Sequence, residues 1–148
     1  MSDATPGEQT DIAAVLSSAH NGPMPCEVSE ERFDEIVGEA IDLIPEELAR
    51  HMENVAILTA DAPSPDQARR LRRGTTLLGL YEGVSLDRRS PTSYTGVMPD
   101  RITIFRRAQC RRARDEADLR LKVARTVAHE IAHHFGISDA RLRELGAY

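Results

Sequence analysis

Residues 128–139 read AHEIAHHFGISD and contain side chains whose types and spacing suit a metal ion. His129 and His133 are four residues apart, so on a helix their imidazoles lie one above the other and can converge on one ion. Glu130 lies at the flank of that face, where a carboxylate does not bind the metal but can take a proton from a metal-bound water and pass it to a leaving amine. The pattern indicates metal-assisted hydrolysis.

A zinc ion bound by these two histidines needs a third protein ligand, because a catalytic zinc usually has three protein ligands and one position open for water. Gly136 allows the chain to leave the helix with a positive φ, and the next candidate ligand is Asp139, which completes an HExxHxxGxxD pattern. Glu144 is the competing third ligand, whereas His134 points away from the pair and is excluded. His51 has no partner at ligand spacing and is expected to be solvated. The plainer alternative is a histidine-rich helix end in which Asp139 only caps the next helix.

One long helix has to position these residues. Its apolar stripe predicts a helix from about Asp115 to Phe135, with Gly136 as a left-handed C-cap. The two histidines lie roughly opposite the stripe. Ser138 or Asp139 then caps a final helix, ARLREL. The stripe consists of Leu121, Ala124, Val127, Ala128, Ile131, Ala132 and Phe135.

The residues before this helix predict two helices and three strands. Ser29 is a good N-cap, with Val28 and Phe33 at the staple positions, and Pro45 ends the first helix and opens a short second one. Strands are expected at 55–61, which reads as buried, at 76–83 and at 101–105, with a long loop between the last two. The order of elements indicates an α+β domain over residues 29–148, and residues 1–28 are expected to be a mobile tail.

Composition narrows the function classes. A chain of 148 residues with 41% hydrophobic and 29% charged residues is the size of one globular domain, and no stretch is apolar enough to span a membrane. The amino terminus lacks the basic region of a secretory signal, which favours a cytoplasmic protein. Cys26 and Cys110 stand alone, so neither a disulfide framework nor a zinc knuckle is expected.

Charge is distributed unevenly along the chain. Residues 1–66 contain 15 acids and only Arg32 and Arg50 as bases, whereas the remainder is basic. Arginine runs at 69–73 and 106–114 could suggest nucleic-acid binding, but the few aromatic residues and the pI of about 5.5 argue against it. The arginines are expected on the solvated surface or in pairs with the acidic half.

Four segments together resemble a known family. PEELARHMENVAILTADAP, LLGLYEG, PDRITIF and HEIAHHFGISDARLREL appear in the order and spacing typical of the small zincin-like metallopeptidase domains of bacteria, or mini-zincins, with an Asp-zincin type motif. The resemblance covers about residues 29–148. It implies a three- or four-stranded sheet packed on the active-site helix, with His129, His133 and Asp139 on Zn²⁺ and Glu130 as the base.

The site also needs support and a substrate surface. Larger zincins place a methionine turn beneath the metal, but no methionine follows His129 here, so Tyr148 is expected to fold back beside the metal. A frayed terminus is the alternative. Tyr81 and Tyr94 are the nearest candidates for a hydroxyl that stabilises the oxyanion, and LLGLYEG could hold an extended peptide by strand addition.

The sequence therefore predicts zinc-dependent hydrolysis of a peptide or protein substrate, with a zinc-bound water activated by Glu130. The alternative is a zincin-fold binding or regulatory module with weak or no catalysis, since a small scaffold has few residues left for substrate pockets. The two hypotheses differ in whether the fourth coordination position of the metal stays open for water. The identity of the substrate and formation of a homo-oligomer stay open.

Overall fold

The computed structural model describes residues 25–69, 77–83 and 99–148 and has a three-stranded mixed sheet. The strands are β1 (Val55–Ala60), β2 (Gly79–Glu82) and β3 (Asp100–Phe105), in the order β1-β3-β2. Central β3 pairs with β1 in parallel and with β2 in antiparallel, so among the described residues β1 and β2 form the two edges. The predicted α+β class and the small sheet are confirmed.

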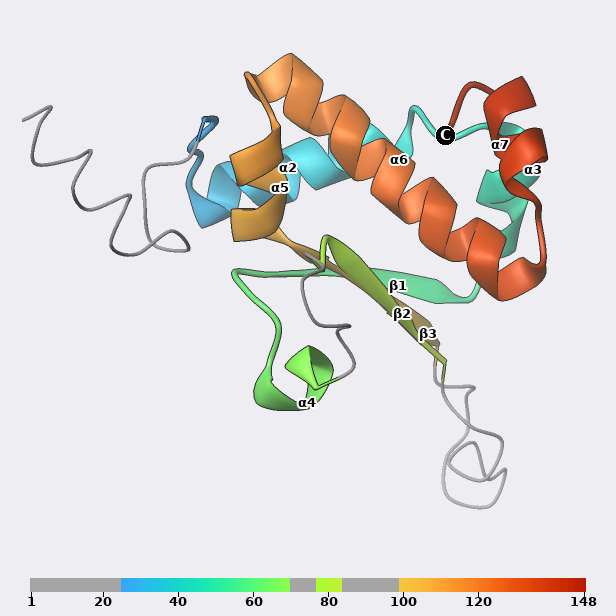
Figure 1. Ribbon diagram of the computed structural model, residues 1–148, viewed down its shortest axis with the longest axis horizontal. Helices are drawn as coiled ribbons and strands as arrows, with labels where there is room; N and C mark the ends of the chain where they lie inside the picture. Colours follow the sequence, from blue (N-terminus) through green and yellow to red (C-terminus); the bar gives the residue numbers. More distant parts are fainter. Residues whose placement is uncertain (1–24, 70–76, 84–98) are drawn as a thin grey trace, which may run out of the picture.

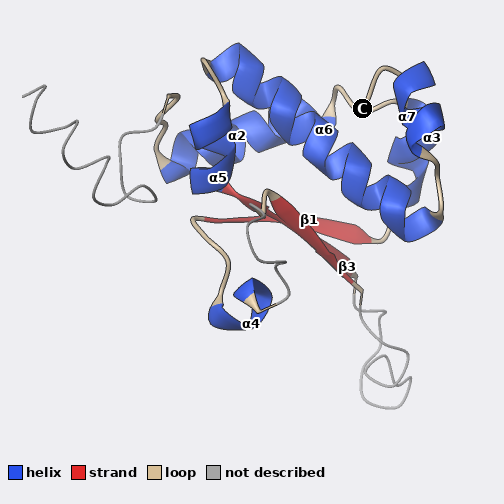
Figure 2. Ribbon diagram, viewed as in Figure 1, coloured by secondary structure: helices blue, strands red, loops and turns tan. Residues whose placement is uncertain are grey.

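Most helices gather on one face of this sheet (Figures 1 and 2). The longest helix, α6 (Glu116–Phe135), crosses this layer beside α2 (Glu30–Ile41). Two short helices, α3 (Glu46–Ala49) and α7 (Asp139–Glu144), lie near the carboxyl end of α6 (Figure 1). The short helix α4 lies on the opposite side of the sheet. The helices are α2 (Glu30–Ile41), α3 (Glu46–Ala49), the 3-10 helix η2 (Arg50–Met52), α4 (Pro65–Ala68), α5 (Arg106–Arg112), α6 (Glu116–Phe135) and α7 (Asp139–Glu144). Among the described residues, no helix combines the length and apolar character that a bilayer crossing requires.

The helix α2 begins as its sequence predicts. The Ser29 hydroxyl accepts a hydrogen bond from the backbone N–H of Arg32 at 3.0 Å, and Val28 and Phe33 are both buried at the staple positions. Pro45 occupies the N-cap of α3, one position before the first helical residue. The face of α2 that contains Ile36 packs against α6, which fixes one side of the long helix.

The long helix α6 begins and ends close to the predicted residues and has the predicted C-cap. The Asp115 side chain accepts from the N–H of Asp118 at 2.8 Å, and Gly136 ends the helix with φ of 75°. The middle of the predicted apolar stripe is buried, but its two ends are not, since Leu121 and Phe135 are 47% and 41% exposed. Toward the start of the helix the buried face runs instead through Leu119 and Val123, which the predicted stripe did not include.

Three details of the sheet and its connections differ from the predictions. The strand β1 is not buried, because it is an edge strand whose outer face is open, and Leu58 is 45% exposed. The helical turns α4 and α5 were not predicted. In α5 the buried residues are Ala108, Gln109 and Cys110, which give a weak apolar signal inside a run of arginines. Strand β2 is shorter than the predicted 76–83, and residue 76 lies outside the described residues.

The core extends to residues that precede Ser29. Cys26 and Val28 are both buried, whereas residues 1–24 of the predicted tail and residues 84–98 of the long loop lie outside the described part of the chain. Cys26 and Cys110 are free thiols, and burial raises the pKa of both. As predicted, acids from the first half of the chain pair with arginines of the second, for example Glu39 with Arg120 at 2.8 Å.

Candidate metal centre

The three predicted ligands converge at the carboxyl end of α6. One ligand atom each from His129, His133 and Asp139 lies within 4.8 Å of the others, and the two imidazole centroids are 5.1 Å apart. Ligands of a single tetrahedral zinc lie about 3.4 Å apart, so a modest torsional adjustment brings these atoms to coordination distance. His129 is half-buried and the other two are exposed, which leaves room for a fourth, non-protein ligand.

The position of Asp139 follows from the turn after α6. The N–H of Ile137 bonds to the carbonyl of Ala132 at 2.8 Å as the chain leaves the helix through Gly136. Ser138, rather than Asp139, caps α7, because its side chain accepts from the N–H of Arg141 at 3.1 Å. The carboxylate of Asp139 is therefore not used as the cap and can face the histidines.

An ion pair then ties α7 to the body of the protein. The Arg141 guanidinium donates to the Glu47 carboxylate of α3 through two nitrogens, one of them Nε at 2.9 Å. The same guanidinium bonds to Glu144 at 2.8 Å. Glu144, the competing third ligand, is 65% exposed and does not join the histidine cluster. Arg141 therefore helps to hold the turn that carries Asp139.

Glu130 lies beside the ligands and is held by the sheet. Its Oε1 accepts a hydrogen bond from the backbone N–H of Tyr81 in β2 at 3.0 Å. Burial raises the pKa of Glu130 above its ordinary value, although this hydrogen bond and the neighbouring His133 and His129 pull the pKa down. A carboxylate with a raised pKa is suited to exchange protons near neutral pH.

Tyr148 folds back beside the predicted site. Gly146 has φ of 75°, and the N–H of Ala147 bonds to the carbonyl of Leu142 at 2.8 Å, so the chain turns after α7. The Tyr148 ring then lies 5.5 Å from the His129 ring, between centroids, and the Arg143 guanidinium lies 4.0 Å from the tyrosine ring centroid. The ring packs against the outer side of one predicted ligand.

Aromatic contacts join the end of α6 to the sheet. The His134 ring stacks on Tyr81 at 4.0 Å between centroids, and the Tyr81 hydroxyl donates to Asp100 at 2.7 Å. That bond engages the hydroxyl that was a candidate for oxyanion stabilisation, and Tyr94 lies outside the described residues. His51 was expected to be solvated without partners, but it stacks on Phe135 at 4.4 Å. The prediction for His51 was wrong because α3 and η2 fold against the end of α6.

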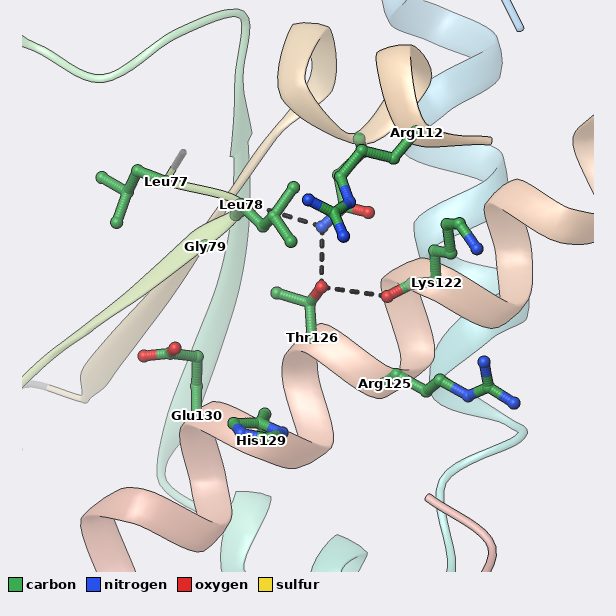
Figure 3. A pocket seen from close by; sticks show the side chains of 10 residues that line it. Leu77, Leu78, Gly79, Arg112, Lys122, Arg125, Thr126, His129 and Glu130 are labelled. Carbon is green, nitrogen blue, oxygen red and sulfur yellow. Dashed lines mark hydrogen bonds between the residues drawn. The ribbon is translucent and has the colours of Figure 1, made fainter. Parts of the chain in front are cut away.

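A cleft of about 420 Å³ opens between β2 and α6 and reaches His129 and Glu130 (Figure 3). Gly79 lines the cleft and allows β2 and α6 to approach closely, since a Cβ at this residue would lie 2.7 Å from Cγ2 of Thr126. Gln109 of α5 is fully buried and spans the two elements, donating to the Thr126 hydroxyl at 2.8 Å and to the Leu78 carbonyl at 3.3 Å.

The main-chain N–H of Tyr81 and the side chains of Arg141 and Gln109 were not identified from the sequence. A backbone donor has no residue-type signal, and the partners of Arg141 and Gln109 are distant in the sequence, so no local pattern reveals them. Gly79 could have been noticed, because an isolated glycine in an apolar strand often marks a close backbone approach.

Comparisons with known proteins identify the family of the chain. The family model of zincin-like metallopeptidases matches residues 52–147, and the chain belongs to that family. A solved structure described as a conserved hypothetical protein from Thermo thermophilus is 23% identical, with a TM-score of 0.44, and the match covers 73% of this chain and 94% of that one. No curated protein matches. The structural likeness is too low to support a conclusion, so the family assignment rests on the family model.

Proposed function

We propose that the protein is a zinc-dependent peptidase, in which His129, His133 and Asp139 hold the metal. The convergence of two imidazoles and one carboxylate at the end of α6 is the observation that carries the proposal. This donor set suits zinc, which takes nitrogen and oxygen ligands in catalytic sites and keeps one position open. Among the described residues, no fourth histidine, cysteine or acid joins the cluster.

Glu130 is the proposed general base. When bound, zinc supplies Lewis acidity that polarises the scissile carbonyl and makes water more acidic. Glu130 takes a proton from the attacking water and delivers it to the leaving amine. Its hydrogen bond from the Tyr81 N–H fixes one carboxylate oxygen and so orients the second oxygen for proton transfer. Partial burial keeps the pKa of Glu130 raised, which favours proton exchange near neutral pH.

The edge of β2 is suited to bind the peptide chain. The Leu78 carbonyl accepts from the Phe105 N–H of β3 at 3.1 Å, so Leu78 faces β3. Because main-chain groups alternate along a strand, those of Gly79 and Tyr81 face the other edge, next to α6. The Tyr81 N–H there is bound to Glu130, so the substrate would use the main-chain groups of Gly79 and the Tyr81 carbonyl. A substrate in extended conformation can add to this edge and pass its scissile bond over Glu130 and the ligands.

The test combines metal content with hydrolysis. Protein purified without chelator is expected to contain about one zinc per chain, and Asp139→Ala is expected to lose most of it. Against a broad peptide library, Glu130→Gln should keep its zinc but lose hydrolysis by at least about a hundredfold, in line with removal of a general base. Wild-type protein that holds zinc but cleaves no peptide would instead favour the non-catalytic binding module.

A further inference from the structure

The cleft beside Glu130 contains cationic side chains at one end. Arg112 of α5 and Lys122 and Arg125 of α6 line it, together with Leu77 and Leu78 from the strand side. Figure 3 shows Arg112 at the end opposite Glu130 and His129, with Lys122 and Arg125 along the helix. Among the described lining residues, Glu130 is the one acid.

Two of these cations differ from the arginines that form ion pairs between elements of the fold. Arg106, Arg120 and Arg141 each pair with a carboxylate at 2.9 Å or less. Within the described part of the chain, no carboxylate lies within pairing distance of Arg112 or Arg125, whose side chains are exposed at the cleft. Their charges are therefore available to a ligand.

Lys122 contributes less positive charge to the cleft. Its Nζ lies 3.4 Å from the Asp118 carboxylate, one helical turn earlier on α6. That pair offsets much of the lysine charge. The net positive potential of the cleft therefore comes mainly from the two arginines, which also present planar donors suited to a carboxylate.

The direction of β2 decides which part of a peptide meets these arginines. Leu77 and Leu78 line the cleft just before β2 begins, and Lys122 and Arg125 precede His129 on α6. Antiparallel pairing is slightly more stable per residue than parallel pairing, so we take the peptide to add antiparallel to β2. It then runs toward the beginning of that strand as it passes the site. The residues on the carboxyl side of the scissile bond therefore enter the cleft.

We infer that the cleft selects peptides with a carboxylate on the carboxyl side of the scissile bond, bound by Arg112 and Arg125. This inference rests on the proposed peptidase function and names its substrate class. The carboxylate can come from an aspartate or glutamate side chain or from the end of the peptide chain, and the two sources share the same chemistry. The hydrophobic wall of Leu77 and Leu78 packs the aliphatic part of the bound residue.

The test measures binding, not turnover, with the zinc-loaded full chain. The probes are hydroxamates, which chelate zinc in place of the scissile peptide, followed by a single Glu, Gln or Lys residue ending in an amide. A fourth probe carries Gln with a free terminal carboxylate. By isothermal titration calorimetry, the Glu amide should bind about tenfold more tightly than the Gln amide, with the Lys amide weakest. The Glu amide and the terminal-carboxylate probe report separately on the two sources.

Variants assign the effect to the two arginines. Arg112→Gln and Arg125→Gln should each reduce the preference for an acidic probe about threefold, because each removes one partly exposed ion pair. Arg114→Gln is the matched control, since Arg114 pairs with Asp118, is 85% exposed and does not line the cleft. The double charge reversal, Arg112→Glu with Arg125→Glu, should turn the preference toward the Lys probe.

Each outcome decides one of the two proposals. Equal affinity for the Glu, Gln and Lys probes, or an equal loss of preference in Arg114→Gln, would overturn the inference and leave the peptidase activity untouched. A protein that prefers the acidic probes but hydrolyses no peptide would support the inference and refute the proposed activity. The absence of binding of every probe would overturn the inference as well.

Discussion

Replacing Gly79 by alanine tests how closely β2 and α6 must approach for the site to form. A Cβ at this position would lie 2.7 Å from Cγ2 of Thr126, and 3.2 Å from both Cδ1 of Ile104 and the carbonyl oxygen of Thr103. Ordinary contacts begin at 3.4 Å. The new methyl group therefore overlaps the helix by about 0.7 Å and crowds the neighbouring strand.

Thr126 cannot simply rotate away from the new methyl group. Its hydroxyl donates to the Lys122 carbonyl at 2.9 Å and accepts from Gln109 at 2.8 Å, so a different χ1 angle would break both bonds. The strand has to move instead. Overpacking of this kind costs about 2 kcal/mol, which in a chain of this size lowers the melting temperature by roughly 4–8 °C.

Movement of β2 also has a functional consequence. The Tyr81 N–H that orients Glu130 is two residues from Gly79 on the same strand, whereas the three proposed ligands lie outside β2. Gly79→Ala should therefore reduce the turnover number about tenfold or more while zinc affinity changes little. Urea unfolding followed by far-ultraviolet circular dichroism measures stability, because the chain has no tryptophan.

A double-mutant cycle separates the clash from other effects of alanine. Thr126→Ser removes Cγ2 and keeps the hydroxyl, so Gly79→Ala should cost less in the Thr126→Ser background, by about 1 kcal/mol. The contact with the Thr103 carbonyl persists, so the rescue is partial. If Gly79→Ala leaves stability unchanged, or if Thr126→Ser gives no relief, the reasoning is wrong.

Three further predictions concern Tyr148, the ion pair of Arg141 and the ion pair between Asp61 and Arg106. Deleting Tyr148, whose ring packs on a proposed ligand, should lower zinc affinity about tenfold in a chelator competition, and an unchanged affinity would reject this role. Arg141→Gln should weaken zinc binding several-fold at a stability cost under about 1 kcal/mol, and Glu47→Gln should reproduce both effects if the ion pair is responsible. The hydrogen bond from Arg106 lowers the pKa of Asp61, so this group stabilises the fold above about pH 3.9 and loses its contribution as pH falls through the lower native pKa. Urea titrations should therefore show Asp61→Asn less stable than wild type at pH 7, with a difference that shrinks as the pH falls below about 3.9.

Local patterns were sufficient to predict much of the fold. Ser29, Asp115 and Gly136 act through residues three or four positions away, so helix starts and ends could be read from short segments. The spacing of His129 and His133 likewise fixes their relation before any tertiary structure is known. The family resemblance implies Asp139 as the third ligand, and in the structure Asp139 lies near the two histidines.

Features that depend on distant segments could not be predicted. The exposure of β1 depends on its position at a sheet edge, and the apolar run VAILTA is equally compatible with a central strand. Helix α5 was missed because its buried face consists of small residues and Gln109, within a segment that reads as an arginine run. His51 was misjudged because its partner, Phe135, is at the far end of the longest helix.

The location of the candidate site explains why its proposed ligands could be predicted from the sequence, whereas the residues that support them could not. His133 and Asp139 are exposed, and the core of the domain is formed without them by residues such as Phe33, Leu119 and Ile131. The core therefore does not include these two proposed ligands. The residue types and spacing of the proposed ligands are therefore set by metal-binding chemistry rather than by packing, so they can be recognised in the sequence. The residues that hold this site in place pack between β2, α6 and α7, where many residue types could serve the same purpose.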